Sequence, residues 1–359
     1  MEPSISSLKL GSNCLTDLGR SYYGPERKDL SLMTRKIVLL LISLLCFLFP
    51  LSPALAQKKK SFEAWLAEFK TEAAAKGISQ ATLQSTLSKI HYLPKVIELQ
   101  KNQPEFKFTV EEYLTRVASE ARVLRGREVL AEQRPLLEKM QERYGVPPHY
   151  LVALWGIETD FGRITGGFPV LDAVATLAYA GSRSDFFKSE LYYALRIIDR
   201  GHISADKMLG SWAGATGQLQ FMPSTFYSYA VDYNGDGRID IWTNLEDILA
   251  SAANYLSRSG WVRDQPWGWE VTLPKDFDRT LAGLDNRRSL EEWEKLGVQP
   301  LRGESVKNSP VWMGAVVAPD GQKGRSFMAL ENYRVIYRWN RSHHFVVAVG
   351  MLADRIAAK

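Results

Sequence analysis

The chain has 359 residues, of which 45% are hydrophobic and 24% are charged, and its formal net charge is +5. These values are typical of a globular protein with enough apolar residues for a substantial core. A net charge this small does not require a nucleic-acid partner, and we expect none.

The first 56 residues predict export rather than structure. A basic start at Arg35 and Lys36 is followed by the apolar stretch Ile37–Phe49 and by a small-x-small cleavage site at residues 54–56. This pattern is typical of a secretory signal peptide over residues 33–56, beginning at Met33. We therefore interpret residues 1–32 as a spurious N-terminal extension. An uncleaved anchor is the alternative, although the apolar stretch is short for a membrane span.

Both cysteines, Cys14 and Cys46, lie before the cleavage site. The residues before Cys46 are Leu44 and Leu45, whereas lipid attachment requires a small residue there. We expect a mature chain, residues 57–359, that is periplasmic, soluble, without a lipid anchor and without a membrane span. Without disulfides its stability must come from its core.

Helical patterns cover most of the mature chain. Apolar residues three and four positions apart are combined with strong helix formers. Ser79 is a candidate N-cap, and Gly145 ends the longest pattern before Pro147. The expected helices span residues 61–76, 79–90, 112–145, 148–162, 185–200, 246–261 and 343–358.

Between about residues 266 and 337 the pattern changes to short β-like segments. These are residues 267–273, 311–318, 326–331 and 333–339, with turns at residues 319–324. We predict a mainly α (α+β) protein with one domain over residues 57–359. Its helical core would span about 140–265 together with the C-terminal helix, and the β-containing part would be a small insertion.

Residues 232–240, DYNGDGRID, match the start of a calcium-binding EF-hand loop. The oxygen ligands would come from Asp232, Asn234, Asp236 and the carbonyl of Arg238. The twelfth position, where a bidentate glutamate is usual, is Thr243. Either Glu246 or Asp247 would have to close the site. A turn that binds no metal is the alternative.

Glu158 lies in an apolar helical pattern, LWGIETDFG, with Leu154, Trp155, Phe161 and Gly162 at helical spacing. Apolar surroundings would raise its pKa, as a general acid at neutral pH requires. Gly162 would leave room for a substrate. A surface residue or a structural ion pair are the alternatives. Asp160 would point to another side of the helix and be solvated.

A second cluster, residues 210–226, alternates glycine and alanine with Ser211, Thr216, Gln218 and Gln220. Such hydroxyl and amide groups are suited to hold a sugar. The alternative is a tight turn before a helix that begins near Pro223. Two adjacent histidines, His343 and His344, would diverge on a helix, which disfavours a zinc site.

Four motifs in this order resemble the lytic murein transglycosylase B family, glycoside hydrolase family 103. They are ALWGIETDFG, GSWAGATGQLQFMPSTF, DYNGDGRIDIW followed by SAANYL, and YRWNRSHHF. The resemblance runs from about Phe62 to Ile356. It implies a lysozyme-like helical core with an extra N-terminal helical part and a small β part.

The resemblance also implies the reaction. Members of the family cleave the β-1,4 bond between N-acetylmuramic acid and N-acetylglucosamine in peptidoglycan and form 1,6-anhydromuramic ends. Glu158 would act first as acid and then as base, the substrate N-acetyl group would replace a second carboxylate, and no catalytic cofactor is implied. Glycan strands would be the partner of a monomeric enzyme.

Substrate-binding residues implied by the resemblance are Ser211, Gln220, Asn340, Tyr113, Tyr255, Arg183 and Trp339. Arg183 lacks the second arginine of the pair found in relatives. The resemblance implies a structural Ca²⁺ ion bound by Asp232, Asn234, Asp236, the Arg238 carbonyl and Asp247, with Glu246 as the alternative closing acid.

Two other functions compete with this one. A hydrolytic muramidase would act on the same bond with water as the acceptor. A non-catalytic peptidoglycan-binding protein would have no need of Glu158, Ser211, Gln220 and Asn340.

Overall fold

The computed structural model describes residues 60–102, 108–301, 312–321 and 324–358. Residues from Trp65 onward lie in one compact unit, and the few described residues before it belong to another, so packing is given for the former alone. The predicted signal peptide, the N-terminal extension and both cysteines lie outside the described residues.

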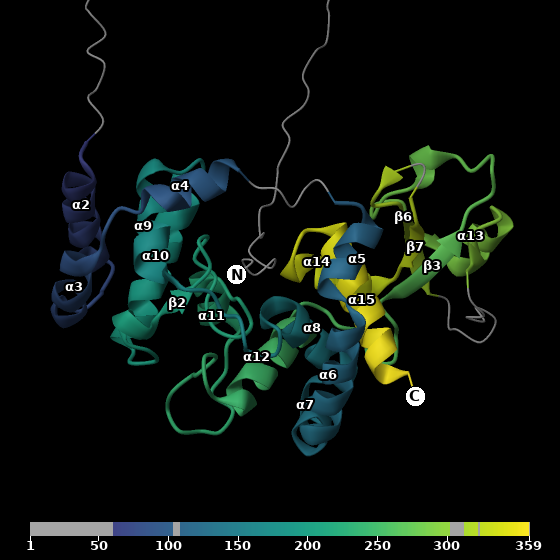
Figure 1. Cartoon of the computed structure of the whole chain (residues 1–359), viewed down its shortest axis with the longest axis horizontal. Coiled ribbons are helices and arrows are strands. Elements are labelled where there is room, and N and C mark those ends of the chain that lie inside the picture. The colour runs from purple at the N-terminus through teal and green to yellow at the C-terminus, as the bar shows by residue number, and fades with distance from the viewer. Residues whose placement is uncertain (1–59, 103–107, 302–311, 322–323, 359) are drawn as a thin grey trace, which may run out of the picture. The chain divides into compact units, whose positions relative to one another are not determined.

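Helices dominate the described chain (Figure 1). The helices are α2 (Phe62–Ala75), α3 (Gln80–Thr86), η1 (Leu87–Lys89), α4 (Pro94–Lys101), α5 (Val110–Val117), α6 (Glu120–Glu132), α7 (Arg134–Tyr144), α8 (Pro148–Thr159), α9 (Val170–Ala180), α10 (Ser184–Asp199), η3 (Ala205–Lys207), α11 (Pro223–Tyr229), α12 (Leu245–Arg258), η4 (Arg279–Leu281), α13 (Leu290–Lys295), α14 (Glu331–Trp339) and α15 (His343–Ala357). The strands are β1 (Phe168–Pro169), β2 (Leu209–Gly210), β3 (Gly268–Thr272), β4 (Arg288–Ser289), β5 (Gln299–Pro300), β6 (Met313–Val317) and β7 (Ser326–Ala329). The prediction of a mainly α protein with a small β part is confirmed. Within the described ranges no helix combines the length and the apolarity needed to cross a bilayer.

The N-terminal helices are connected to the rest by side-chain hydrogen bonds. Ser79 is the N-cap of α3, as predicted, and its hydroxyl accepts a hydrogen bond from the amide of Thr82. Asp199, at the end of α10, accepts hydrogen bonds from the hydroxyls of Ser79 and Thr82. Ser79 thus caps an amide at the start of α3 and also bonds to Asp199. These bonds hold the start of α3 against the end of α10.

The single long helix expected over residues 112–145 is wrong: this stretch forms α5, α6 and α7. Ser119 starts α6 as an N-cap that accepts from the amide of Arg122. Pro135, in the first turn of α7, has no amide hydrogen to continue the preceding helix. Gly145 ends α7 in the left-handed conformation, as predicted.

Helix α8 lies in the middle of the helical core. Its residues from Tyr150 to Thr159 are all buried. Helices α6, α7, α12 and α15 pack against it, and Figure 1 shows α15 beside it. Because neighbours cover every side of α8, a polar group on this helix cannot reach solvent by pointing away from the core. Glu158 is such a group.

The β part is a five-stranded sheet with strand order β4-β6-β7-β3-β5, and all its pairs are antiparallel. It has its own cluster of buried side chains, formed by Trp269, Val271, Phe277, Leu290, Trp293, Val298, Val316, Met328 and Leu330. Three of the four predicted β-like segments contain strands. The fourth, residues 333–339, is helical and belongs to α14, whose buried Tyr333, Ile336 and Trp339 recur every three residues. The aromatic and β-branched residues suggested a strand, but their period is that of a helix.

The packing of α15 depends on a glycine, and this leads to a testable expectation. A Cβ atom on Gly350 would lie 2.2 Å from two ring atoms of Trp267. Trp267 is 1% exposed and has little room to move. Gly350→Ala is therefore expected to lower the free energy of unfolding by about 1–3 kcal/mol. Thermal unfolding measures this, with Gly167→Ala as the control because nothing lies within 4 Å of that position. Equal stability of both variants would contradict the expectation.

Candidate active site

Glu158 is the penultimate residue of α8 and is 1% exposed. Its Oε1 accepts a hydrogen bond of 2.6 Å from the indole nitrogen of Trp339, which lies 181 residues further along the chain. The carboxyl group is therefore oriented by a residue of α14. Burial disfavours the charged form of a carboxyl group, whereas an N–H donor favours it.

Aromatic side chains hold Trp339 in place. Its ring is 0% exposed, and the ring of Tyr255 meets it edge-on with a centroid distance of 4.7 Å. Phe221 packs on it at 5.2 Å. The hydroxyl of Tyr255 donates to the carbonyl of Arg338 over 2.8 Å, and burial raises the pKa of this hydroxyl. Trp339 and Tyr255 therefore form part of the wall around Glu158, and their predicted contact with substrate stays a prediction.

The surroundings predicted for Glu158 are wrong in one respect, because α8 ends at Thr159. Asp160, Phe161 and Gly162 follow with φ of 53°, 59° and 83°, so the chain turns back instead of continuing the helical face. The ring of Phe161 packs on Trp155 at 5.9 Å. Gly162 makes room for a protein side chain, since a Cβ there would lie 2.2 Å from Oε1 of Gln218.

Asp160 was expected to be solvated, and this is also wrong. Its side chain is 16% exposed and forms ion pairs with Arg122 at 3.4 Å and with Arg163. A carboxylate engaged by two guanidinium groups is poorly placed to act as a second proton donor beside Glu158.

Gln218 connects α8 to the loop that follows β2, a role that the sequence did not indicate. Its Oε1 accepts from the indole nitrogen of Trp155 over 2.9 Å, and its Nε2 donates to the carbonyl of Trp242 over 2.9 Å. Its own carbonyl accepts from the hydroxyl of Thr159 over 2.8 Å. The only hint in the sequence was Gly162, because a glycine leaves space for a large side chain such as that of Gln218.

The loop after β2 is tied back on itself, and the helix near Pro223 is present as α11. Ser211 is 6% exposed, and its hydroxyl accepts from the amide of Ala215 over 3.1 Å. Gln220 has φ of 48°, and its Nε2 donates to the carbonyls of Thr165 and Gly217. These bonds leave the amide oxygen of Gln220 as the group available for a ligand.

Two buried amide oxygens in this region have no hydrogen-bond donor among the described residues. They are Oε1 of Gln220, a residue 1% exposed, and Oδ1 of Asn340, a residue 3% exposed. Gln220 directly precedes Phe221, which packs on Trp339, and Asn340 directly follows Trp339. Buried polar atoms are nearly always hydrogen-bonded, so acceptors of this kind indicate a ligand or an ordered water.

Tyr113 and Arg183 lie on other elements. Tyr113, on α5, meets the ring of His344 edge-on with a centroid distance of 6.1 Å. Arg183 precedes α10, and its guanidinium lies 4.1 Å from the centroid of the Phe186 ring. Their predicted contact with substrate stays a prediction.

The two adjacent histidines diverge, as expected for a helix. His343 shares a hydrogen bond of 2.8 Å with the hydroxyl of Tyr333, and burial lowers the pKa of its imidazole to about 4. His344 contacts Asp320 at 2.9 Å.

The calcium-like loop between α11 and α12 has the turns that its sequence predicts. Gly235 and Gly237 have φ of 75° and 88°, and the carboxylate of Asp232 accepts from both of their amides. Asp236 accepts from the amide of Arg238 and from the side-chain amide of Asn234. The carboxylates of Asp232 and Asp236 therefore hold the turns of the loop through its own amides.

The acids after the loop differ in orientation. Asp247 is 0% exposed and accepts from the amides of Tyr233 and Asp240, both over 2.8 Å. Burial and the charge of Asp232 raise the pKa of Asp247, so a cation between these carboxylates would be favourable. Glu246 is exposed, and Thr243 donates its hydroxyl to Asp240. Among the described residues, no three His, Cys, Asp or Glu side chains come close enough to hold a metal by themselves.

Comparisons with known proteins agree with this arrangement. Residues 61–354 match the family model described as the transglycosylase SLT domain. The chain is 30% identical over 303 residues to membrane-bound lytic murein transglycosylase B of Escherichia coli. The aligned region covers 78% of this chain and 79% of that protein.

Solved structures show the same fold. SltB3 of Pseudomonas aeruginosa in complex with NAG-NAM-pentapeptide is 40% identical, with a TM-score of 0.80 over 84% of this chain and 80% of that chain. The Escherichia coli lytic transglycosylase Slt35 in complex with calcium is 29% identical, with a TM-score of 0.71 over 81% of this chain and 92% of that chain. These similarities confirm the expected lysozyme-like helical fold. The chain therefore belongs to the transglycosylase SLT domain family, the lytic murein transglycosylases.

Proposed function

We propose that this chain cleaves the β-1,4 bond between N-acetylmuramic acid and N-acetylglucosamine in peptidoglycan and forms 1,6-anhydromuramic ends. The observation that carries the proposal is the buried carboxyl group of Glu158, oriented by the indole N–H of Trp339. Burial disfavours the charged form of a carboxyl group and an N–H donor favours it, and a group that acts first as an acid and then as a base has to take both forms.

In the first step Glu158 gives its proton to the glycosidic oxygen as the bond to the leaving sugar breaks. The developing charge at the anomeric carbon is met by the N-acetyl group of the same muramic residue. In the second step ionised Glu158 removes the proton from the O6 hydroxyl, and O6 closes the anhydro ring. Asp160, the nearest acid in the sequence, is engaged by Arg122 and Arg163, which supports the substrate's own acetamide as the internal nucleophile.

The other substrate-binding residues are assigned from the hydrogen bonds that their side chains can make. The amide oxygens of Gln220 and Asn340 would accept from sugar hydroxyl or acetamide N–H groups. Ser211 would contact the muramic acetamide, and Tyr113 and Arg183 would contact more distant parts of the strand. Trp339 and Tyr255 act through Glu158 in this proposal.

Product analysis tests the proposal. Purified peptidoglycan digested with the wild-type protein should release fragments one water lighter than muramidase products, as measured by mass spectrometry. Fragments with ordinary reducing muramic ends would mean that water is the acceptor. A protein that binds glycan but releases no fragments would be a binding protein.

We further propose that the chain is exported to the periplasm and works there as a soluble monomer on glycan strands. The signal-peptide pattern of residues 33–56 supports this location, although it lies outside the described residues.

We also propose that the loop binds a structural Ca²⁺ ion through Asp232, Asn234, Asp236, the Arg238 carbonyl and Asp247. The orientation of Asp247 toward the loop amides supports it over Glu246 as the closing acid. The ion would connect the loop to the start of α12 and takes no part in the chemistry.

Calcium removal is expected to lower the thermal stability of the protein. An ion present at 100 times its dissociation constant stabilises the folded state by about 2.7 kcal/mol, which corresponds to a midpoint shift of roughly 4 °C for a domain of about 300 residues. Thermal unfolding with Ca²⁺ and with a chelator measures the shift. Asp247→Asn should abolish it, whereas Glu246→Gln should keep it. A midpoint that does not respond to the chelator would refute the site, and the opposite response of the two variants would assign Glu246.

A further inference from the structure

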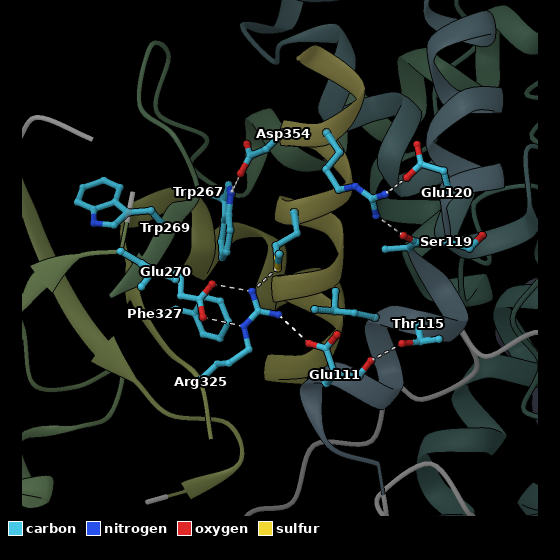
Figure 2. Close-up of a pocket in the computed structure, with 15 residues that line it drawn as sticks. Glu111, Thr115, Ser119, Glu120, Trp267, Trp269, Glu270, Arg325, Phe327 and Asp354 are labelled. Atoms are coloured by element: carbon cyan, nitrogen blue, oxygen red, sulfur yellow. Dashed lines mark hydrogen bonds and ion pairs between the residues drawn. The ribbon is translucent and has the colours of Figure 1, made fainter. Parts of the chain in front are cut away.

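A pocket of about 720 Å³ lies between α5, α6, the β3–β7 strand pair and α15 (Figure 2). This volume is in the range of small-molecule sites. Side chains from these elements line it, and Figure 2 shows Arg325 near the middle with Glu270 on one side and Glu111 on the other. None of the residues assigned to the reaction belongs to its lining.

One lining residue of the pocket contacts α8 near the end opposite to Glu158. The amide of Trp267, which lines the pocket, donates to the hydroxyl of Tyr150 over 3.1 Å. Tyr150 precedes Glu158 by eight residues, a rise of about 12 Å along the helix. The pocket is therefore separate from the carboxyl group that reacts.

Both arginines that line the pocket, Arg325 and Arg355, already donate hydrogen bonds to oxygen atoms of the protein. Arg325 donates from Nε and Nη2 to the two carboxylate oxygens of Glu270, over 2.7 and 2.6 Å, and from Nη1 to Glu111 over 3.2 Å. Arg355 donates to the carbonyl of Ala118 and to Glu120. An anionic ligand would thus have to displace an existing partner.

The lining of the pocket contains more carboxyl groups than guanidinium groups. Four carboxyl groups, from Glu111, Glu120, Glu270 and Asp354, face two guanidinium groups in the lining. Glu111 and Glu120 have side chains 75% and 69% exposed, and a carboxylate can accept more hydrogen bonds than each receives from its arginine. On a chain with a net charge of +5, this pocket is locally negative. It favours a positively charged group that donates hydrogen bonds, such as the ammonium group of a larger ligand.

We propose that the pocket binds the primary ammonium group of the diamino acid in a peptidoglycan stem peptide. This rests on the proposed function, since the stem peptide belongs to the polymer that the enzyme would cleave. The apolar side chains of Leu114 and Met351 line the same pocket and would contact the aliphatic part of the diamino acid. A stem bound here, away from Glu158, would hold the enzyme on the wall between cleavage events.

The test uses the full chain with Glu158→Gln, so that binding is measured without turnover. Calorimetric titration compares a stem tripeptide whose diamino acid has a free side-chain amine with the same tripeptide acetylated at that amine. The free amine is expected to bind at least about 10-fold more tightly, since acetylation removes both the positive charge and the charge-assisted hydrogen bonds to the carboxylates. Equal affinities, or no binding of the free amine, would overturn the proposal.

Matched variants locate the binding. Glu111→Gln combined with Glu120→Gln should weaken binding of the free amine about 10-fold. Glu128→Gln combined with Glu138→Gln should leave it unchanged, because these two glutamates are similarly exposed, at 62% and 61%, and also pair with arginines. An equal loss in both double variants would mean a general charge effect. An unrelated lysine tripeptide that binds as tightly as the stem would refute the assignment to peptidoglycan.

Wild-type digestion of glycan strands without peptides separates this proposal from the proposed function. Anhydro products with no binding of the amine probe would reject the pocket alone. An absence of anhydro products would reject the proposed function, whatever the probe does.

Discussion

Glu158→Gln is expected to reduce the release of anhydromuropeptides by about 10²–10⁴-fold, because general acid–base catalysis contributes an effect of this size. The amide keeps the shape of the side chain and can still accept from the indole N–H of Trp339. It can neither give a proton to the leaving oxygen nor remove one from O6. The measurement is the initial rate of product formation on purified peptidoglycan, together with the thermal midpoint of the variant.

Asp160→Asn is the matched control. Asparagine tolerates the left-handed backbone that position 160 adopts, with φ of 53°. It removes the charge that pairs with Arg122 and Arg163 without touching Glu158. Its rate should stay within about threefold of wild type, since partly exposed ion pairs contribute on the order of 1 kcal/mol or less. If Glu158→Gln kept most of the activity, or if Asp160→Asn lost as much, the assignment of Glu158 would be wrong.

Trp339→Phe is expected to reduce kcat by about 10–100-fold with a smaller change in KM. The substitution removes the indole N–H and keeps an aromatic ring against Tyr255 and Phe221. A hydrogen bond to a charged group contributes about 1.5–3 kcal/mol, and each 1.4 kcal/mol is a factor of ten in rate. Because the lost donor favours ionised Glu158, the pH optimum should also move upward. Steady-state rates across pH measure both effects.

Trp293→Phe separates positioning from packing. Trp293 is 1% exposed, and its indole nitrogen donates to the carbonyl of Gly314 over 3.0 Å in the β part. Both variants remove a buried indole N–H, so their thermal midpoints should fall by similar amounts. The pH optimum should move only in Trp339→Phe. If the two variants changed activity and stability alike, Trp339 would be a packing residue with no special relation to Glu158.

The fold was predictable where a local pattern was strong. Ser79 and Gly145 marked a helix start and a helix end through cap chemistry that acts within a few residues. The extended helix over residues 112–145 failed because Ser119 starts a new helix inside a run of good helix formers. Residues 333–339 failed because β-branched and aromatic residues were given more weight than the period of the buried side chains.

The candidate site was predictable in part. Glu158 was identified from its apolar neighbours and its motif, but only Leu154 and Trp155 of the four predicted neighbours share its helix. Phe161 and Gly162 leave the helical face because Asp160 turns the chain, and Trp339 takes their place from a distant helix. Gln218, which joins Trp155 to Trp242, has no local pattern that distinguishes it from other polar loop residues.

The amino-acid sequence by itself determined the helical class, the single acidic residue in an apolar helix, and the glycine turns of the calcium-like loop. Each follows from interactions between residues close in the chain, where spacing decides geometry. Only the tertiary structure decided that Trp339 orients Glu158, that Asp160 is held in ion pairs and that Asp247 faces the loop. The first two contacts join residues 181 and 38 positions apart. Their partners depend on how α8 packs among its neighbours, and no periodicity in the sequence encodes that packing.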